Sequence, residues 1–419
     1  MELNIGTTTD EESNDFLRCL WAEMAKEFGK CGWNYAPNKK LIKNRIFFGF
    51  MDIGVETDIA VSITYKERGT IKNIFFELPD KLDAIPKSME FYHRLKAVVK
   101  NAKLNNGHYT SFQFSPVIFS YKALATYEGK YFKTDIVDNG PTRLRFEIKG
   151  YDRNQVGGKA VKKLKQVMSF LSIETNAPYM WEEHTEEHGR MLETEIFQID
   201  NNFIDGVPIV DNYIVLSKEG KVFLDKILNP DERDDENLDL FLKACHHFYT
   251  AKRYDSVVFD NYSDDLLVVD VKEKYPNDSL DRELSISLSR GESNTEIATT
   301  LYLSALEVLT LINYKDENCS SCGQPKFQIS KRVRSLVSHY LNDHVAQMLN
   351  EYYDKRSKYL HTGIKLTTDE PTTSLIPLLD KDDKSGCKIP IQVSLLNLRE
   401  YVSYCLRKYY KENLLGKVK

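Results

Sequence analysis

Hydrophobic periodicity changes near residue 235, and this change restricts the chain to a fold with two unlike parts. Before that point, β-branched and aromatic residues form short runs separated by glycine and charged turns, as in β-strands. Beyond it, apolar residues recur every three or four positions, as on one face of an amphipathic helix. The predicted fold class is therefore an α+β N-terminal domain followed by an all-α helical bundle.

The N-terminal part is predicted to mix helices with strands. The predicted helices cover residues 10–28, 87–104 and 158–171. The predicted strands cover residues 44–51, 58–65, 70–78, 108–120, 130–136, 143–148, 195–199 and 209–216. The sequence shows no internal repeat, so we expect these segments to form one α+β domain.

An acidic, turn-rich stretch at residues 229–236, Asn-Pro-Asp-Glu-Arg-Asp-Asp-Glu, separates the two parts. Such a stretch contributes nothing to a hydrophobic core, and its composition is typical of a linker or of a helix start. We therefore place the domain boundary here. Residues 1–228 would form the α+β domain, with an unassigned sensor or regulatory role, and residues 229–419 the helical domain.

Apolar side chains at helical spacing define the predicted helices of the second domain. Three stripes are Leu238, Phe241, Leu242, Cys245, Phe248 and Tyr249; Ile297, Leu301, Ala305, Val308 and Ile312; and Val333, Leu336, Val337, Tyr340 and Leu341. A fourth helix is predicted at 344–360 after a capping break at Asn342, with the stripe Val345, Met348, Leu349, Tyr352, Tyr359 and Leu360. After a long loop, a last helix at 394–410 turns Leu395, Leu398, Val402, Cys405 and Tyr409 inward. Residues 254–290 fit no single pattern and include a candidate hairpin at 266–271 and 283–288.

Arg356 is the unusual residue of the fourth helix, because it stands four positions after Tyr352 on the apolar face. A guanidinium in that position needs a carboxylate, a backbone acceptor or a polar cleft. His361 follows five residues later, about 140° around the helix, so the two residues do not form a same-face metal site. The alternative is structural: a buried ion pair for Arg356, with Glu307 or Asp354 as partner, and a helix-dipole contact for His361.

The segment Tyr353-Asp-Lys-Arg-Ser-Lys-Tyr-Leu-His-Thr-Gly363 resembles the signature of HEPN domains, an arginine followed four to six residues later by a histidine. The wider pattern is similar to the Apea-like HEPN group. It adds a helix with Ala305-Leu-Glu-Val-Leu309 and a basic helix with Lys331-Arg-Val-Arg-Ser335. The resemblance covers about residues 238–410, and no family is recognised in the first 225 residues. It implies an HEPN-like helical bundle that pairs as a homodimer.

This resemblance implies a metal-independent endoribonuclease that needs no cofactor. RNA supplies its own nucleophile in the 2′-hydroxyl, so a histidine is sufficient as acid or base and an arginine as phosphate clamp. We assign these catalytic roles to His361 and Arg356, with Ser357, Asp354, Glu307 and Tyr359 in support. HEPN resemblance further suggests a bacterial toxin or antiviral defence effector, as in abortive infection, acting on tRNA or mRNA. A non-catalytic HEPN dimer that binds RNA or acts as a scaffold is the alternative.

Local charge agrees with an RNA partner. Residues 320–365 contain eight Lys or Arg and three acidic side chains, within a chain of net charge -5. The residues expected to bind RNA are Lys331, Arg332, Arg334, Lys355 and Lys358. Tyr352, Tyr353 and Tyr359 lie between the basic positions and suit base stacking. The alternative is an ordinary solvated helix face.

Two other motifs carry metal-ligand spacing. His184-Thr-Glu-Glu-His188 matches the arrangement of inverted zinc peptidases, but its acidic surroundings lack an apolar stripe and favour a solvated segment. Cys319 and Cys322 form half of a zinc knuckle, and the sequence has no second Cys-x-x-Cys. We interpret them as free thiols in a turn, and Cys245-His246-His247 as packing.

Composition indicates a cytoplasmic protein. The seven cysteines are odd in number and irregularly spaced, which argues against a secreted disulfide framework. The first 15 residues are polar and acidic, unlike a signal peptide. No run of apolar residues is long enough for a membrane helix.

Overall fold

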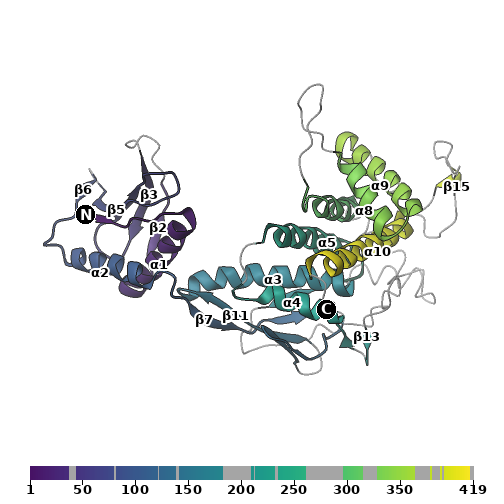
Figure 1. Ribbon diagram of the computed structural model, residues 1–419, viewed down its shortest axis with the longest axis horizontal. Coiled ribbons are helices and arrows are strands. Elements are labelled where there is room, and N and C mark those ends of the chain that lie inside the picture. The colour runs from purple at the N-terminus through teal and green to yellow at the C-terminus, as the bar shows by residue number, and fades with distance from the viewer. Residues whose placement is uncertain are drawn as a thin grey trace, which may run out of the picture. The chain divides into compact units, whose positions relative to one another are not determined.

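The computed structural model describes residues 1–36, 44–79, 82–120, 122–137, 141–182, 209–211, 213–231, 235–260, 296–314, 328–363, 378–379, 387–388 and 391–415. An N-terminal region rich in antiparallel sheet precedes a region of helices (Figure 1). The chain divides into two compact units. Unit 1 comprises Met1–Phe112 and Ile148–Ala160, and unit 2 comprises Gln113–Glu147 and Val161–Lys419.

Unit 1 is an antiparallel sheet with two helices. Its strand order is β1-β5-β4-β3-β2, and β6 pairs with β5. Its elements are β1 (Glu2–Asn4), α1 (Asp10–Phe28), β2 (Gly32–Asn34), β3 (Arg45–Asp52), β4 (Ile59–Thr64), β5 (Asn73–Leu78), β6 (Asp83–Ala84) and α2 (Glu90–Asn105). The two predicted helices and the three predicted strands of this region are confirmed, although α2 begins three residues later than expected.

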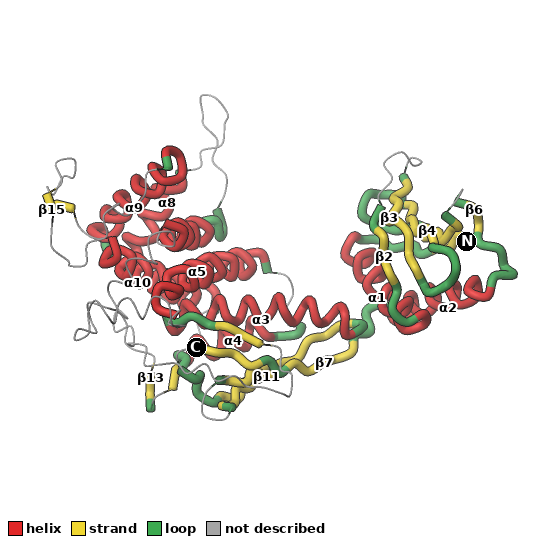
Figure 2. The backbone as a smooth tube through the Cα atoms, turned by 180° about the vertical axis from the view of Figure 1, so that it is seen from behind, coloured by secondary structure: helices red, strands yellow, loops and turns green. Residues whose placement is uncertain are grey.

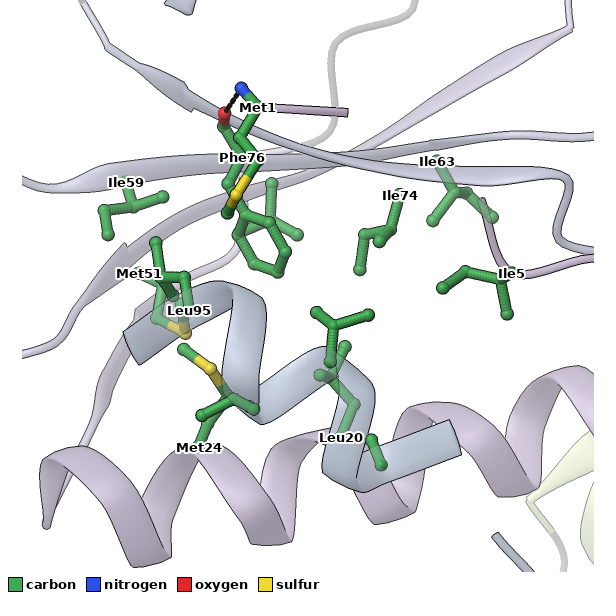
Figure 3. Packing of buried hydrophobic residues seen from close by; sticks show 14 of the residues in the cluster. Met1, Ile5, Leu20, Met24, Met51, Ile59, Ile63, Ile74, Phe76 and Leu95 are labelled. Carbon is green, nitrogen blue, oxygen red and sulfur yellow. Dashed lines mark hydrogen bonds between the residues drawn. The ribbon is translucent and has the colours of Figure 1, made fainter. Parts of the chain in front are cut away.

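The core of unit 1 lies between one face of the sheet and the two helices. Figure 3 shows Leu20 and Met24 of α1 and Leu95 of α2 directed towards sheet residues that include Ile59 and Ile74. These five side chains are at most 1% exposed. Burial of this apolar area is the main stabilising contribution to the unit.

Unit 2 contains a second antiparallel sheet, of order β12-β8-β11-β10-β9, with β7 paired to β11. Its strands are β7 (Thr110–Phe114), β8 (Val117–Phe119), β9 (Tyr127–Glu128), β10 (Phe132–Ile136), β11 (Thr142–Gly150) and β12 (Met180–Glu182). The division between the units falls within β7 and β11. The single strand predicted at 108–120 is wrong, because Pro116 separates two strands and has no N–H for a continuous ladder. The strand predicted at 209–216 is a hairpin of β13 (Ile209–Val210) and β14 (Tyr213–Ile214), and the one at 195–199 lies outside the described residues.

Helices form most of the remainder of the described chain (Figure 2). They are α3 (Arg153–Thr175), α4 (Lys218–Leu228), α5 (Glu236–Asp260), a helix over residues 296–309, α8 (Ile329–Tyr340), α9 (Asp343–Thr362) and α10 (Ile391–Tyr409), with a π-helical turn at Tyr410–Leu414. The short strands β15 (Leu378–Leu379) and β16 (Cys387–Lys388) pair with each other.

Two of these helices differ from expectation. α3 begins at Arg153 rather than at 158, because the Asp152 carboxylate accepts a hydrogen bond from the Gln155 N–H at 2.7 Å and caps it. α4 was not predicted. Ser217 caps it by accepting from the Gly220 N–H at 2.9 Å, and Phe223 and Ile227 of its inner face are fully buried.

α3 is the central helix of unit 2. All residues from 167 to 177 are buried, which is unusual for a helix with several polar side chains. Phe170 packs against Phe223 of α4 and Tyr410 after α10, with ring centroids 4.8 and 5.2 Å apart. Phe223 also contacts Phe241 of α5 at 5.4 Å. Helices α3, α4 and α5 and the turn after α10 therefore share one aromatic core.

The inner face of the helix over residues 296–309 is rotated from the predicted stripe. Ile297 is 37% exposed, and Leu301 and Val308 are only partly buried. The fully buried positions are Ala298, Tyr302, Leu303, Ala305, Leu306 and Leu309. Tyr302 sets this orientation, since its ring lies 5.2 Å from Phe248 of α5.

The expected boundary near residue 229 lies inside unit 2, and the independence of residues 229–419 stays a prediction. The candidate hairpin at 266–271 and 283–288 lies outside the described residues. Within the part of the chain that the structure describes, no helix combines the length and apolar character needed to cross a membrane.

Candidate functional site

The Arg356–His361 motif occupies the last two turns of α9. The Asn342 side chain accepts from the Val345 N–H at 2.9 Å and starts the helix, as predicted. Gly363, at φ 70°, ends it and donates its N–H to the Tyr359 carbonyl at 3.0 Å. α8 packs beside α9. α8 has 12 residues and α9 has 20, so the C-terminal end of α9 extends beyond α8.

The buried face of α9 leads to Arg356. Val345, Leu349 and Tyr352 are buried, as expected. Met348 and Leu360, also predicted inward, are 36% and 54% exposed. Ala346 and Tyr353 complete the buried face of α9, and Met348 lies at its edge. Leu360 lies in the last turn of the helix.

Arg356 forms an ion pair with Glu307. Its Nη1 donates to Glu307 Oε1, and the two side chains are 18% and 21% exposed. Glu307 comes from the helix over residues 296–309, so the pair connects two helices. Asp354, the other carboxylate considered as a partner, is exposed on α9.

One further donor atom beside this pair lacks an acceptor among the described residues. It is the Nε of Arg356 itself, which is buried. Burial, the charge of the nearby Glu307 carboxylate and a hydrogen bond to that carboxylate raise the pKa of Tyr353, so its hydroxyl keeps its proton. Buried polar groups are nearly always paired, so an orphaned donor of a guanidinium suits an ordered water or an anion.

Arg332 of α8 shows the same feature. Its guanidinium lies over the ring of Tyr314, 3.9 Å from the centroid, and its Nε and Nη1 are buried without an acceptor in the described chain. The other basic residues predicted to bind RNA are exposed on α8 and α9. They are Lys331, Arg334, Lys355 and Lys358.

His361 differs from Arg356 in its surroundings. It is exposed in the last turn of α9, as Ser357 is one turn earlier, and its ring forms no hydrogen bond with the described residues. Tyr359 is partly exposed. The two proposed catalytic side chains therefore lie in different environments of one helix, and their catalytic roles stay predictions.

Sequence reasoning missed His247 of α5. Cys245 is buried, as the packing interpretation requires, whereas His247 is half-buried. Burial and His246 lower the pKa of His247, and Glu307 opposes this effect. The spacing within α5 gives no signal for His247, since Lys243 one turn earlier is exposed and paired with Asp239.

Unit 1 has a surface hollow of about 580 Å³ between α1, the segment after α2 and the start of α3. Its charged lining includes Glu23, Lys26, His108, Asp152 and Arg153. Both signs of charge are present, and Glu23 is occupied by a hydrogen bond from Asn105 at 3.0 Å. This lining indicates no particular ligand.

The candidate zinc motifs lie outside the described residues: His184 and His188 in one, Cys319 and Cys322 in the other. Among the residues that are described, no three histidine, cysteine or acidic side chains gather as a metal site would require. Comparison with protein-family models, curated proteins and solved structures finds no match for this chain.

Proposed function

We propose that the chain is a metal-independent endoribonuclease of HEPN type, with its site at the end of α9. The observation that carries the proposal is a set of buried donor atoms without acceptors on two paired helices. These donors are Arg332 Nε and Nη1 and Arg356 Nε. A phosphate group supplies several strong acceptor oxygens and suits such donors.

Glu307 supports this assignment of Arg356. An ion pair with a carboxylate fixes the orientation of the guanidinium, and Arg356 keeps further donors beyond the one bonded to Glu307. A phosphate that reaches the same guanidinium competes with a single carboxylate oxygen. Arg356 would thereby clamp the scissile phosphate and stabilise the charge that grows in the transition state.

His361 would transfer protons in the proposed reaction. The 2′-hydroxyl loses its proton and its oxygen attacks the adjacent phosphorus; the bond to the 5′ oxygen breaks, and that oxygen gains a proton. The products are a 2′,3′-cyclic phosphate and a 5′-hydroxyl. The resemblance to HEPN domains implies a site built from two copies of this helix, in which the Arg–His pairs of two protomers meet. We therefore include a homodimer in the proposal.

The exposed lysines of α9 provide a path for the RNA backbone. Lys355 and Lys358 lie on either side of Arg356 in the sequence and are exposed, and Tyr359 beside Lys358 is partly exposed. Basic side chains with an interleaved aromatic ring suit a single strand. tRNA and mRNA are the proposed substrates, and the N-terminal part would restrain or trigger the nuclease. Such a protein would act in the cytoplasm as an antiviral or toxin effector.

A second candidate is an RNA-binding module without catalysis. The Arg356–Glu307 pair favours it, because a partly buried ion pair between two helices is sufficient to explain an arginine on an apolar face. In that case Arg356 holds the helices together, and the exposed lysines alone meet the RNA.

Cleavage of total RNA in EDTA, followed on a denaturing gel, separates the two candidates. The proteins compared are the wild type, His361→Ala and His339→Ala, the last an exposed histidine of α8 and a matched control. The endoribonuclease proposal requires that wild type and His339→Ala cut RNA and that His361→Ala does not. Intact RNA with the wild type, together with binding of RNA, would favour the module.

A further inference from the structure

Arg332 lies in the first turn of α8, a helix with basic but no acidic side chains. Lys331, Arg332 and Arg334 all fall within its first two turns. Positive side chains at this end of a helix are unfavourable, because the helix dipole also places positive potential there. The arrangement therefore weakens α8 unless an anion lies beside it.

The Arg332 guanidinium is held in position but not neutralised. It lies 3.9 Å from the centroid of the Tyr314 ring, and its Nε and Nη1 are buried without an acceptor in the described chain. Among the described residues, no carboxylate pairs with it. Arg356 differs, because the Glu307 carboxylate already balances its charge. Of the two arginines, Arg332 thus has the greater need of an anionic partner.

One segment of the chain positions both guanidinium groups. Glu307, the partner of Arg356, is followed seven residues later by Tyr314, on which Arg332 lies. The backbone between them forms a hydrogen-bonded turn, in which the Tyr314 N–H donates to the Leu311 carbonyl at 3.1 Å. The separation of the two guanidinium groups is therefore set by this segment.

The hairpin of α8 and α9 brings the two arginines to the same end. Only Leu341 and Asn342 connect these helices, which pack side by side and so run antiparallel (Figure 1). Counted outward from this turn, Arg332 lies at about the level of Tyr352, so Arg356 stands about 6 Å further along the hairpin. Because each guanidinium is held by a different partner, this separation suits neighbouring phosphates of one strand better than a single phosphate.

We propose that Arg332, held on Tyr314, binds the RNA phosphate next to the one that Arg356 clamps. This inference rests on the proposed function and narrows its substrate class to single strands with a phosphate beside the scissile one. A dinucleotide, which has one internal phosphate, offers only one of the two contacts. Arg332 supplies charge and hydrogen bonds, and it makes or breaks no covalent bond. Tyr314 is a positioning residue that acts through Arg332.

A cycle that combines a change in the protein with a change in the RNA tests the proposal. The substrate is a short RNA with one free 2′-hydroxyl and 2′-O-methyl groups elsewhere, so that cleavage in EDTA occurs at one known phosphate. A methylphosphonate on one side or the other of that phosphate removes one flanking negative charge. We expect one of the two positions to slow wild-type cleavage about tenfold, the effect of losing a charge-assisted hydrogen bond. In Arg332→Gln, which should itself be about tenfold slower, the same methylphosphonate should have no further effect.

Three further variants complete the experiment. Arg68→Gln removes an exposed arginine of unit 1 and should respond to the methylphosphonate as the wild type does. Tyr314→Leu removes the ring under Arg332 and should lose much of the response, whereas Tyr314→Phe should retain more of it. Circular dichroism verifies that each variant is folded.

Three results would contradict the inference. Wild-type cleavage that is insensitive to both methylphosphonates would do so without reference to any variant. Equal sensitivity of wild type and Arg332→Gln would mean that Arg332 only packs on Tyr314. Failure of the wild type to cut the unmodified RNA would reject the proposed function and the inference with it, whereas the first two results reject only the role of Arg332.

Discussion

The hydroxyl of Tyr410 donates a hydrogen bond of 2.6 Å to the Glu174 carboxylate, across 236 positions of sequence. Glu174 is 4% exposed and also accepts from the backbone N–H and the hydroxyl of Ser217. This carboxylate therefore ties α3 to the start of α4 and to the end of α10. Such a buried group is stable only while its partners remain in place.

Tyr410→Phe should lower the free energy of unfolding by about 1–3 kcal/mol, because it removes one donor from a buried carboxylate. Urea denaturation followed by circular dichroism measures the loss. Tyr401→Phe is the matched control, since Tyr401 is a partly exposed tyrosine of α10 without a hydrogen bond to the described residues. Equal stability of the two variants would contradict the account of Glu174.

Glu400→Gln should lower the free energy of unfolding by more than Tyr410→Phe does. Arg407 is 1% exposed, and its Nη2 lies 3.2 Å from Glu400 Oε1 while its Nη1 donates to the Ile173 carbonyl at 3.2 Å. Removing the carboxylate leaves a buried cation without its counter-charge, which costs about 3–5 kcal/mol. Asp239→Asn, in the exposed pair with Lys243, should cost less than about 1 kcal/mol in the same assay. A small effect of Glu400→Gln would mean that other acceptors satisfy Arg407.

Gly49→Ala should destabilise unit 1. Gly49 has φ 122°, and an added Cβ would meet the Asn34 carbonyl and lie 2.7 Å from the Ala36 nitrogen. Both the backbone conformation and the space exclude a side chain. Gly157→Ala, in the helical α3 with open space around it, should instead stabilise by about 0.5–1 kcal/mol. Thermal melting of both variants checks the opposite signs, and a stable Gly49→Ala would contradict the packing of β2 on β3.

Stability should fall in alkali partly because of Cys405. Burial raises the pKa of this thiol to about 12, from 9.0. The unfolded chain loses the proton above pH 9 while the folded chain keeps it, so this contribution is complete below pH 9 and is lost as the pH rises towards 12. When the pH is raised from 8 to 10.5, the free energy of unfolding should fall by about 2 kcal/mol more in the wild type than in Cys405→Ala. Burial also raises the pKa of the half-buried Cys31 thiol, so Cys31→Ala compares partial with full burial. Identical losses in Cys405→Ala and wild type would contradict the burial of Cys405.

Much of the local structure could be predicted because it depends on short-range patterns. The Thr9 cap of α1, the Asn342 cap and the Gly363 end of α9 are local signals, and the corresponding helix limits agree closely. Tertiary contacts explain what was missed. The helix over residues 296–309 is rotated because Tyr302 packs on Phe248, and α4 escaped notice because its buried face is complementary to α3.

Of the candidate site, only the pairing of Arg356 with a carboxylate could be predicted from the sequence. Arg356 on an apolar face requires a carboxylate, and Glu307 provides it. Which residues of α5 and of the helix over residues 296–309 face one another depends on the register between the two helices, which the Asn237–Asn313 and Phe248–Tyr302 contacts set. No spacing within one helix could indicate that register.

The central claim is that Arg356 acts on RNA through the 2′-hydroxyl, and product analysis tests it most directly. One oligonucleotide sequence is prepared as RNA and as DNA and incubated in EDTA with wild type or Arg356→Ala, with Lys96→Ala on α2 as the control. We predict that wild type and Lys96→Ala cut only the RNA, leaving 2′,3′-cyclic phosphate ends, and that Arg356→Ala leaves it intact. Cleavage of the DNA, a requirement for added metal, or equal cleavage by Arg356→Ala would contradict the account.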